Sequence, residues 1–553
     1  MKVLIVGGVA GGASAAARLR RLDEHAEIIL FEKGPYISFA NCGLPYYLSR
    51  TIPEEEDLLL QTPESFYARF HVDVRVNQEV LSIDRAAKKI TIKNVKTFKI
   101  YEENYDKLIL SPGAAAIKPD SVPGLDTEGV FTLRSVPDVK AIDTWILEQN
   151  VKHVVVAGGG YIGVEAAENL AERGLKVTLV EFAPHIINTV DSEMAVMAEQ
   201  ELEKHHIILK LGCALQAVTR VNGKLHIATT DDLVEADMLL MSIGVTPNSE
   251  LAKKAGLTLG TKNCISVNDK MQTNDPDIYA VGDAVEITEF VTGTKQNIAL
   301  AGPANRQGRI AADQICGIDS RYKNTQGSAI MKVFDLAVAS TGISEKTAQR
   351  LNLDYDKVYL HSGSHASYYP NGKPLSVKIL FERNTGRLLG GQFVGADGAD
   401  KRCDVLATAI RCDMKATDLI DLELCYAPPF NSAKDQLNMA GFAIENILTG
   451  KVKNYHWNQI HALDKDRVTL LDVRTNKEFE NGHVPGFTHI PLHELRDRLQ
   501  ELPKDKPVFV HCFSGLRSYV ACRILTGHGY DSYNISGGYY FYNCFKNANL
   551  LNE

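Results

Sequence analysis

The sequence predicts an α/β fold that contains two similar strand–turn–helix units within a multidomain chain. The first unit begins with the apolar stretch Lys2–Val6, which precedes a glycine-rich turn and a helical pattern. The second repeats this order, with His153–Ala157 before the turn Gly158–Gly163. The chain has 553 residues, which exceeds what one hydrophobic core organises. Strands alternating with helices are typical of parallel sheets.

The composition is that of an ordinary globular protein and excludes several classes. A net charge of −8 argues against a nucleic-acid-binding surface. Ten cysteines occur without any CxxC pair, which disfavours a disulfide framework and a zinc site, so we expect reduced thiols in the cytoplasm. The start, Met1–Ala17, resembles a signal peptide, but its glycines fit a strand–turn–helix better. No apolar run of about 18 residues occurs.

The first unit has the features of a dinucleotide site. After the turn and its helix, the strand Glu27–Glu32 ends in an acid about 20 residues beyond the last turn glycine. Such a turn places phosphates on a helix N-terminus, and the acid binds the ribose. Val9 at the middle glycine position weakens the motif, and a glycine turn in any parallel sheet is the alternative. The residues assigned to this site are Gly7, Gly8, Val9, Ala10, Gly11, Gly12, Glu32 and Lys33.

The second unit carries a full G-x-G-x-x-G turn, and its next strand, Lys176–Glu181, also ends in an acid. The charge of Glu181 should repel a 2′-phosphate, so NADH is expected rather than NADPH. Two such units in one chain predict one site for a flavin dinucleotide (FAD) and one for a nicotinamide cofactor. The residues assigned to the second site are Gly158, Gly160, Tyr161, Ile162, Gly163 and Glu181.

Three later turns complete the predicted cofactor sites. Tyr105–Ala114 and Asp237–Asn248 are strands that end in small-residue turns, and Ile278–Asp283 is a strand that ends in Gly-Asp. The acid of that Gly-Asp pair can accept a hydrogen bond from a ribityl hydroxyl, although such pairs are also common in loops. The residues assigned here are Ser111, Pro112, Gly113, Gly244, Gly282, Asp283 and Ala284.

An isolated cysteine, Cys42, lies in Ser38–Tyr47 after the first unit. A thiolate is the species that attacks a sulfur–sulfur bond. Since no second cysteine is near in sequence, the expected intermediate is a mixed disulfide with a small thiol. The preceding helix presents Ser14, Arg18 and Arg21 on one face; these residues form either a solvated basic face or a site for a phosphorylated ligand.

The last hundred residues form a separate unit around a second isolated cysteine. The strand Pro507–His511 runs into Cys512-x-x-Gly515-x-Arg517, and a helix begins directly after it. Backbone N–H groups and the helix N-terminus should stabilise the Cys512 thiolate and hold an anion, and Arg517 should add charge. A phosphatase loop usually has one more residue before its arginine. With Leu-Asp-Val-Arg474 and Gly-His483-x-Pro-Gly upstream, the unit resembles a rhodanese (sulfurtransferase) domain.

The order GGVAGG, SFANCGLPYY, GGGYIG, GVTPN and IYAVGDA resembles the pyridine nucleotide-disulfide oxidoreductases over residues 1 to about 446. The single cysteine in SFANCGLPY is similar to the coenzyme A-disulfide reductase branch, and no C-x4-C pair is present because Tyr47 stands five residues after Cys42. NADH oxidases and peroxidases of this fold also use one cysteine, usually in a different local sequence.

The resemblance implies a homodimer whose partner subunit contributes tyrosines near the cysteine. We assign these roles to Tyr368 and Tyr426, and Tyr369 is an alternative to Tyr368. It also implies a coenzyme A ligand, or bound cofactor, whose phosphates need cations and whose pantetheine arm needs polar partners. The residues assigned to this ligand are Arg18, Arg21 and Lys434 for the phosphates, Ser14 on the same helix face, and Ser38, Asn41 and Asn305 for the arm and thiol; Asn305 is equally well read as an ordinary loop residue.

The predicted domains follow from these motifs: two Rossmann-like domains, an α+β dimerisation domain and an α/β rhodanese domain. Their boundaries are 1–112 and 245–325 for FAD, 113–244 for NADH, 326–446 for dimerisation, 447–457 for a linker and 458–553 for rhodanese.

The predicted function is reduction of coenzyme A persulfide, polysulfide or coenzyme A disulfide by NADH. Cys42 would form the mixed disulfide with coenzyme A, and Cys512 would carry sulfane sulfur as a persulfide. The fused rhodanese unit favours a persulfide substrate. The alternatives are a coenzyme A-disulfide reductase that maintains the thiol pool, an NADH oxidase or peroxidase that cycles Cys42 through sulfenic acid, and a redox sensor or sulfur carrier.

Overall fold

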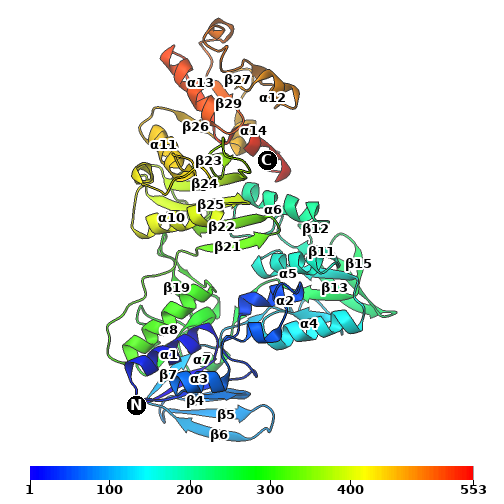
Figure 1. Cartoon of the computed structure of the whole chain (residues 1–553), viewed down its shortest axis with the longest axis vertical. Helices are drawn as coiled ribbons and strands as arrows, with labels where there is room; N and C mark the ends of the chain where they lie inside the picture. Colours follow the sequence, from blue (N-terminus) through cyan, green and yellow to red (C-terminus); the bar gives the residue numbers. More distant parts are fainter. Residues whose placement is uncertain (552–553) are drawn as a thin grey trace. The chain divides into compact units, whose positions relative to one another are not determined.

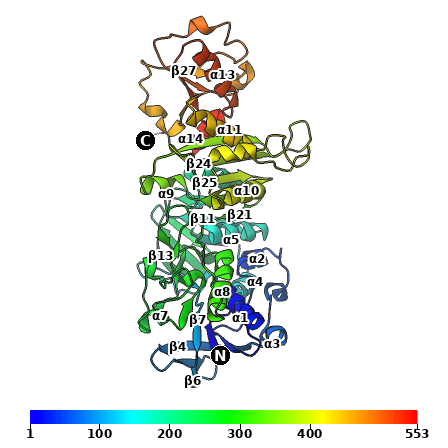
Figure 2. The same cartoon turned by 90° about the vertical axis from the view of Figure 1, so that its left-hand side faces the viewer.

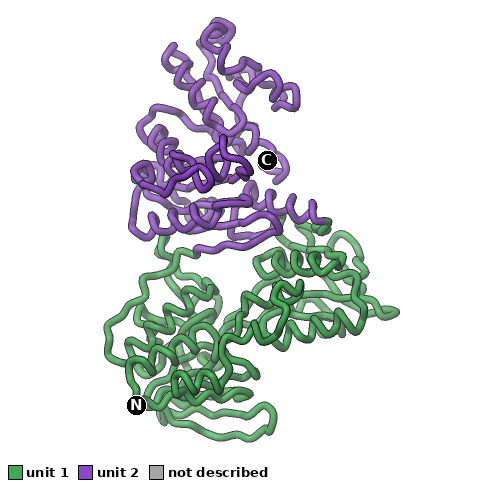
Figure 3. The backbone as a smooth tube through the Cα atoms, viewed as in Figure 1, with its two compact units in different colours: residues 1–184, 206–327 green, residues 185–205, 328–553 purple. Residues whose placement is uncertain are grey.

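The computed structural model describes residues 1–551 and divides the chain into two compact units (Figure 3). Unit 1 comprises residues 1–184 and 206–327, and unit 2 comprises residues 185–205 and 328 onward. The chain passes three times from one unit to the other. Both units contain strands and helices in layers (Figure 1), which confirms the predicted α/β fold.

Unit 1 contains a five-stranded parallel sheet formed by four strands from the first 110 residues and one from residues 278–280. The helices α1 (Ala10–Leu22) and α8 (Ala301–Ile315) lie side by side in both views (Figures 1 and 2). Gly308 permits this approach, since a Cβ there would lie 2.3 Å from the Gly11 carbonyl oxygen. In spatial order the strands are β18 (Ile278–Ala280), β7 (Lys107–Leu110), β1 (Lys2–Val6), β2 (Glu27–Glu32) and β3 (Asp73–Val76).

A second parallel sheet of unit 1 repeats this pattern. Its three central strands are mostly apolar and buried, as expected where helices cover a parallel sheet on both faces. The helices that follow its strands are α4 (Val136–Glu148) and α5 (Tyr161–Glu172). In spatial order the strands are β12 (Ile208–Leu211), β11 (Lys176–Glu181), β10 (His153–Ala157), β16 (Met238–Met241) and β9 (Val130–Thr132).

Two small antiparallel sheets and one strand pair complete the sheets that position the site in unit 1. The pair β8 (Ala114–Ala116) and β17 (Val245–Pro247) joins the two parallel sheets at the places where the chain crosses between them. The small sheets are β4 (Gln78–Asp84), β5 (Lys89–Asn94) and β6 (Ile100–Asn104), and β13 (Leu215–Val221), β14 (Lys224–Thr229) and β15 (Leu233–Ala236).

Unit 2 contains a five-stranded antiparallel sheet, against which α6 (Ser192–Lys204) and α10 (Ala399–Arg411) pack. The helix α11 (Gln436–Leu448) follows this part of the chain. In spatial order the strands are β21 (Ala329–Val333), β22 (Leu336–Gly342), β25 (Leu388–Gly395), β24 (Pro374–Glu382) and β23 (Tyr355–Gly363).

The C-terminal part of unit 2 is a parallel sheet with helices. The helices are α12 (Asn476–Glu480), α13 (Leu516–Gly527) and α14 (Gly538–Asn547), and α14 also packs on α6. In spatial order the strands are β26 (Lys453–Tyr455), β30 (Ser532–Ile535), β29 (Val508–His511), β27 (Thr469–Asp472) and β28 (Thr488–His489).

The linker predicted over 447–457 is wrong for much of its length. The helix α11 continues to Leu448, and β26 pairs with β30 as part of the C-terminal sheet. Trp457 is fully buried, and its indole N–H donates to the Gly538 carbonyl at 2.7 Å. A large apolar ring is strongly favoured inside a core, so this segment folds with the C-terminal sheet instead of bridging in solvent.

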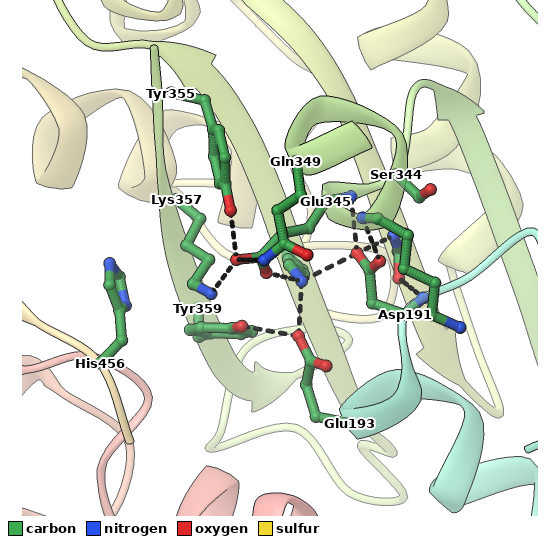
Figure 4. Close-up of polar contacts among 12 residues, drawn as sticks. Asp191, Glu193, Ser344, Glu345, Gln349, Tyr355, Lys357, Tyr359 and His456 are labelled. Atoms are coloured by element: carbon green, nitrogen blue, oxygen red, sulfur yellow. Dashed lines mark hydrogen bonds and ion pairs between the residues drawn. The ribbon is translucent and has the colours of Figure 1, made fainter. Parts of the chain in front are cut away.

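The prediction that 113–244 form one domain also fails at α6. Residues 185–205 belong to unit 2, where Asp191 and Glu193 surround the fully buried Lys378. The Lys378 ammonium donates to Asp191 at 2.8 Å and to Glu345 at 2.6 Å, and it also contacts Glu193. Figure 4 shows these carboxylates converging, with Lys357 on Glu345. Since an unpaired buried charge is very unfavourable, this cluster holds α6 in unit 2.

Candidate functional site

The first glycine turn joins β1 to α1 in unit 1. Gly7 has a φ of +96°, and a Cβ on Gly12 would lie 1.9 Å from the Gly7 carbonyl oxygen, so both positions require glycine. The Glu32 carboxylate accepts hydrogen bonds from the N–H groups of Gly8 (2.9 Å) and Gly34 (2.8 Å). A carboxylate has about four acceptor positions, so Glu32 can still accept from ribose hydroxyls. The turn fits a dinucleotide on the N-terminus of α1.

The second turn, between β10 and α5, has the same construction. Gly158 has a φ of +110°, and a Cβ on Gly163 would lie 1.8 Å from the Gly158 carbonyl oxygen. The Glu181 carboxylate accepts from the Gly159 N–H at 2.5 Å. No atom lies within 4 Å of a Cβ built on Gly160, which leaves room for a pyrophosphate to approach the backbone. Unit 1 therefore has two turns that fit dinucleotides.

The remaining predicted cofactor residues mostly gather near the first turn. Ser111 and Gly113 follow β7, while Gly282 and Asp283 follow β18, and these strands lie next to one another beside β1. The carboxyl ends of neighbouring parallel strands meet at one edge of a sheet, where ligands of such folds bind. Lys33 instead forms an ion pair with Glu79 at 2.8 Å.

Cys42 lies in the short helix η1 (Asn41–Gly43), directly before α2 (Leu44–Leu48). Its thiol is open to solvent on one side. Desolvation by the surrounding groups is the main cause that raises the pKa of Cys42; Glu165 and Asp283 raise it further, while Arg134 lowers it. The segment is tied to the first turn, because the Ser38 N–H donates to the Gly8 carbonyl at 2.8 Å.

Arg134 is a residue of this site that the sequence motifs miss. The Arg134 carbonyl accepts a hydrogen bond from the Asn41 side-chain amide at 3.1 Å. The Arg134 guanidinium forms an ion pair with Asp283 at 3.4 Å. Its buried Nε has no protein partner, so this donor is available to a ligand. It follows β9 in a stretch without a motif, so only the fold brings it to Cys42.

Glu165 on α5 is a second residue that the motifs miss. It accepts a hydrogen bond from the Tyr46 hydroxyl at 3.4 Å. Burial raises the pKa of Glu165 to about 7, and burial with the nearby Glu165 charge raises the pKa of Tyr46 to about 12. A carboxyl that changes charge near neutral pH beside a thiol is typical of a functional site.

The predicted ligand-binding face of α1 is only partly available. The Ser14 hydroxyl donates to the Asn305 side chain at 2.7 Å, so these two candidates lie together. Arg18 forms an ion pair with the buried Asp313 at 2.7 Å, and its charge is therefore already balanced. Arg21 is exposed and is the better placed of the two arginines to contact a phosphate.

In unit 2 the two predicted tyrosines meet. The hydroxyls of Tyr368 and Tyr426 are 2.7 Å apart. Tyr368 is 73% exposed and Tyr426 is 46% exposed. Tyr369 instead packs edge-on against His365. The pair thus lies at the surface of unit 2, and the exposed Lys434 lies farther along the same chain segment.

A buried arginine holds the two tyrosine loops together, and it too lies outside any motif. Arg402 on α10 donates to the Ser364 carbonyl at 2.8 Å and to the Asn431 side chain at 2.9 Å. It also pairs with Asp435 at 2.9 Å. Asn431 accepts from the Ala366 N–H at 3.0 Å, and these contacts fix the backbone on both sides of the tyrosine pair.

The C-terminal cysteine has the predicted cradle. The Cys512 sulfur is buried and accepts hydrogen bonds from the Gly515 N–H at 3.1 Å and the Ser518 hydroxyl at 3.5 Å. Gly515 has a φ of +107°, which turns its N–H toward the sulfur. These donors and the N-terminus of α13 stabilise a thiolate or an anion.

The charge of Arg517 acts on Cys512 and is shared with a carboxylate: hydrogen bonds with Glu478 are the main cause that raises the pKa of Arg517, and Cys512 raises it further. The Arg517 guanidinium forms two hydrogen bonds with the Glu478 carboxylate, at 2.7 and 2.6 Å. Glu478 lies on α12, 39 positions earlier in the chain. Long-range pairs of this kind leave no periodic signal, so the residue that balances Arg517 is found only in the folded structure.

Family models match three parts of the chain: "Pyridine nucleotide-disulphide oxidoreductase" over residues 1–308, its dimerisation domain over 328–437, and "Rhodanese-like domain" over 458–543. The first match covers more than half of the sequence. The chain belongs to the pyridine nucleotide-disulphide oxidoreductases. It is an oxidoreductase with a rhodanese-like domain, and membership implies FAD and NAD(P)H, which the two glycine turns fit.

Relatives of this oxidoreductase are similar over most of its length. The coenzyme A disulfide reductase of Staphylococcus aureus (strain JH9) is 38% identical over 80% of this chain and 99% of that protein. The reduced Bacillus anthracis CoADR-RHD structure has a TM-score of 0.96, 48% identity and 98% coverage of each chain. The NAD-dependent persulfide reductase of A. fulgidus has a TM-score of 0.91, 35% identity and coverage of 98% of this chain and 100% of its own.

None of the oxidoreductase's helices within residues 1–551 has the length and apolarity needed to cross a membrane.

We expect Glu165→Gln to make the Cys42 thiolate form at lower pH, by about half a pH unit. In the wild type the ionised Glu165 raises the pKa of Cys42, and the amide removes this charge. The measurement is the rate of Cys42 alkylation against pH, with the labelled peptide identified by mass spectrometry. Glu172→Gln, an exposed change on the same helix, should leave the profile unchanged. An unshifted midpoint for Glu165→Gln contradicts the assignment.

Proposed function

We propose that this oxidoreductase uses NADH to reduce coenzyme A persulfide at Cys42. The observation that carries the proposal is the pairing of two sulfur sites in one chain: a lone thiol beside a dinucleotide-binding turn, and Cys512 in a cradle suited to a persulfide. A module that carries sulfane sulfur favours a substrate that contains sulfane sulfur. The name of the A. fulgidus relative, a persulfide reductase, supports this choice.

The first step is attack by the Cys42 thiolate on coenzyme A persulfide. The bond between the two persulfide sulfurs breaks, hydrosulfide leaves, and Cys42–S–S–CoA forms. Arg134 favours the thiolate that this step needs, because its charge opposes the burial and the carboxylates that raise the pKa of Cys42. The Asn41 side chain donates to the Arg134 carbonyl. Asn41 and Ser38 belong to the same segment as Cys42.

The turn Gly7–Gly12 and Glu32 would hold FAD, which would supply the electron pair of NADH for cleavage of this disulfide. Cleavage releases the Cys42 thiolate and, with one proton, coenzyme A thiol. The sum is NADH plus coenzyme A persulfide to NAD⁺, coenzyme A thiol and hydrosulfide. The charge of Glu181 at the end of β11 favours NADH, because it would repel a 2′-phosphate.

In this proposal the enzyme is a homodimer, and the tyrosine pair of a second copy completes each Cys42 site. The exposure of Tyr368 and Tyr426 supports this, since both residues lie at the surface, where their hydroxyls share a hydrogen bond with each other. They would donate hydrogen bonds to the leaving sulfur, while Arg402 holds their loops. Arg21 and Lys434 are the exposed cations for the phosphates of coenzyme A.

At the second site, Cys512 persulfide would pass its outer sulfur to the coenzyme A thiolate. The S–S bond on Cys512 breaks, coenzyme A persulfide forms, and the Cys512 thiolate is regenerated. The second candidate function is plain coenzyme A disulfide reduction, which the name of the staphylococcal relatives favours.

A substrate comparison tests the proposal. NADH oxidation is followed without air with coenzyme A persulfide, coenzyme A disulfide and polysulfide, and then with oxygen and peroxide. We expect kcat/KM for coenzyme A persulfide to exceed that for the disulfide by at least about tenfold, a difference of about 1.4 kcal/mol in transition-state free energy. Equal or faster turnover of the disulfide identifies the second candidate instead, and fast turnover with oxygen or peroxide identifies an oxidase or peroxidase.

A further inference from the structure

The Cys512 loop contains one charged side chain, Arg517, within Cys512–Ser518. Its guanidinium is held by both oxygens of Glu478, at 2.7 and 2.6 Å. A paired arrangement of this kind is among the stronger side-chain contacts. The positive charge that would attract an anionic donor is therefore balanced before any substrate arrives.

Glu478 is fixed from its own helix as well. Its carboxylate accepts from the Thr475 N–H at 3.0 Å and from the Thr475 hydroxyl at 2.8 Å, as part of the capping box of α12. The hydrogen bonds with Arg517 are the main cause that lowers the pKa of Glu478, to about 2. The carboxylate is thus ionised and in place throughout the neutral pH range.

The side of this pair that is formed by the loop and α13 carries exposed apolar side chains. Phe513, Leu516 and Val520 are large hydrophobic residues on the loop and the first turns of α13, and they are 38%, 57% and 37% exposed. Another arginine of the domain, Arg474, is buried and paired with Asp472 at 2.7 Å. The Cys512 loop therefore offers apolar side chains and backbone N–H groups, and its one arginine is already paired with a carboxylate.

Two kinds of sulfur donor make opposite demands on such a loop. Thiosulfate is a dianion, and its attack by the Cys512 thiolate releases sulfite, also a dianion, so a free cation is needed to offset the repulsion. An organic persulfide brings an apolar or amide-containing arm and releases a single thiolate. The first donor meets an arginine that is already paired here, whereas the second finds exposed apolar side chains.

We propose that Cys512 takes its sulfur from a low-molecular-weight organic persulfide and that the Glu478–Arg517 pair excludes thiosulfate. This inference rests on the proposed sulfur-carrying role of Cys512. In the step, the Cys512 thiolate attacks the outer sulfur of R–S–SH. The bond between the two sulfurs of the donor breaks, R–S⁻ leaves with its electron pair, and Cys512–S–SH forms with the proton retained. Glu478 acts on donor choice through Arg517.

The test measures how fast each donor adds one sulfur atom to Cys512. The full-length FAD-loaded protein carries Cys42→Ser, so that the other sulfur-reactive site does not contribute. Pantetheine persulfide and thiosulfate are supplied separately, and persulfide on the Cys512 peptide is quantified by mass spectrometry over time. We expect the organic donor to react at least about tenfold faster.

Removing the balancing charge should change this preference. Glu478→Gln in the same background frees Arg517 and is expected to raise the thiosulfate rate about tenfold, with a smaller effect on pantetheine persulfide. The matched control is Glu480→Gln, an exposed change on the same helix, which should alter neither rate. Circular dichroism and thermal melting establish that each variant is folded.

Ionic strength gives a readout that needs no Glu478 variant. If the pair is neutral, thiosulfate meets a net negative loop, and added KCl should screen the repulsion and raise its rate. A fall with salt indicates a free Arg517 and overturns the inference. Equal rates for both donors, or an equal effect of Glu478→Gln on both, overturn it as well while leaving Cys512 as a sulfur carrier. Failure of both donors to load Cys512 overturns the carrier role and, with it, this inference.

Discussion

Replacing Cys42 with serine is expected to lower NADH-dependent reduction of every sulfur substrate by at least about a thousandfold. The hydroxyl of serine has almost no anionic form at neutral pH and cannot form the mixed disulfide. Arg134, which offsets part of the rise in the pKa of Cys42, acts on the sulfur, so it cannot compensate for the loss of the thiol. The measurement is anaerobic NADH oxidation at saturating coenzyme A persulfide and coenzyme A disulfide.

Cys412→Ser is the matched control for that experiment. Cys412 is also an exposed thiol, and it lies in unit 2 at the end of α10, where no sulfur chemistry is assigned to it. Its replacement should leave turnover unchanged. If Cys42→Ser keeps more than about one tenth of the wild-type rate, Cys42 is not the reacting thiol and the proposed mechanism falls.

Lys378→Met is expected to destabilise unit 2 by about 3–5 kcal/mol at neutral pH. Lys378 is fully buried and pairs with Asp191, Glu193 and Glu345. Methionine has a similar length but no charge, so the carboxylates lose their main counter-ion, and Lys357 remains as the second cation, on Glu345. The loss should be among the largest of any single change in unit 2, because buried unpaired charge is so unfavourable.

The pH dependence of this loss has a defined sign. In the wild type, Lys378 lowers the pKa of Asp191 and Glu345. Carboxyls with a lowered folded pKa stabilise the protein above their unfolded pKa, near 4, and that contribution is lost as the pH falls through the lower folded value. In the variant these carboxyls can relieve repulsion by taking up protons. The difference in stability is therefore expected to be largest at pH 7 and to shrink toward pH 5.

Tryptophan fluorescence can follow this unit alone. The chain has two tryptophans, and Trp145→Phe leaves Trp457, which is buried in unit 2. Urea unfolding at pH 7, 6 and 5 in this background compares Lys378→Met with Lys465→Met, an exposed lysine of the same unit. A loss below about 1 kcal/mol for Lys378→Met at pH 7 contradicts the role given to the cluster.

The local motifs of the sequence predicted the family, the α/β fold and the two reactive thiols as candidates. Glycines at fixed spacings indicate backbone conformations that few other residues adopt, as at Gly7 and Gly158. The acids that follow at a fixed distance indicate a dinucleotide site. The order of these motifs matched the family that the comparisons then showed. The assigned roles of Cys42 and Cys512 remain predictions that the experiments above address.

The tertiary structure alone decided which charges meet these thiols and how the domains are bounded. Arg134 and Glu165 reach Cys42, and Glu478 reaches Arg517, across separations that no periodic pattern encodes. The helix α6, read from the sequence as part of the NADH-binding domain, folds into unit 2 because buried Lys378 requires its acids. Spacing along the chain determines local backbone geometry, whereas the compensation of buried charge depends on which distant segments pack together.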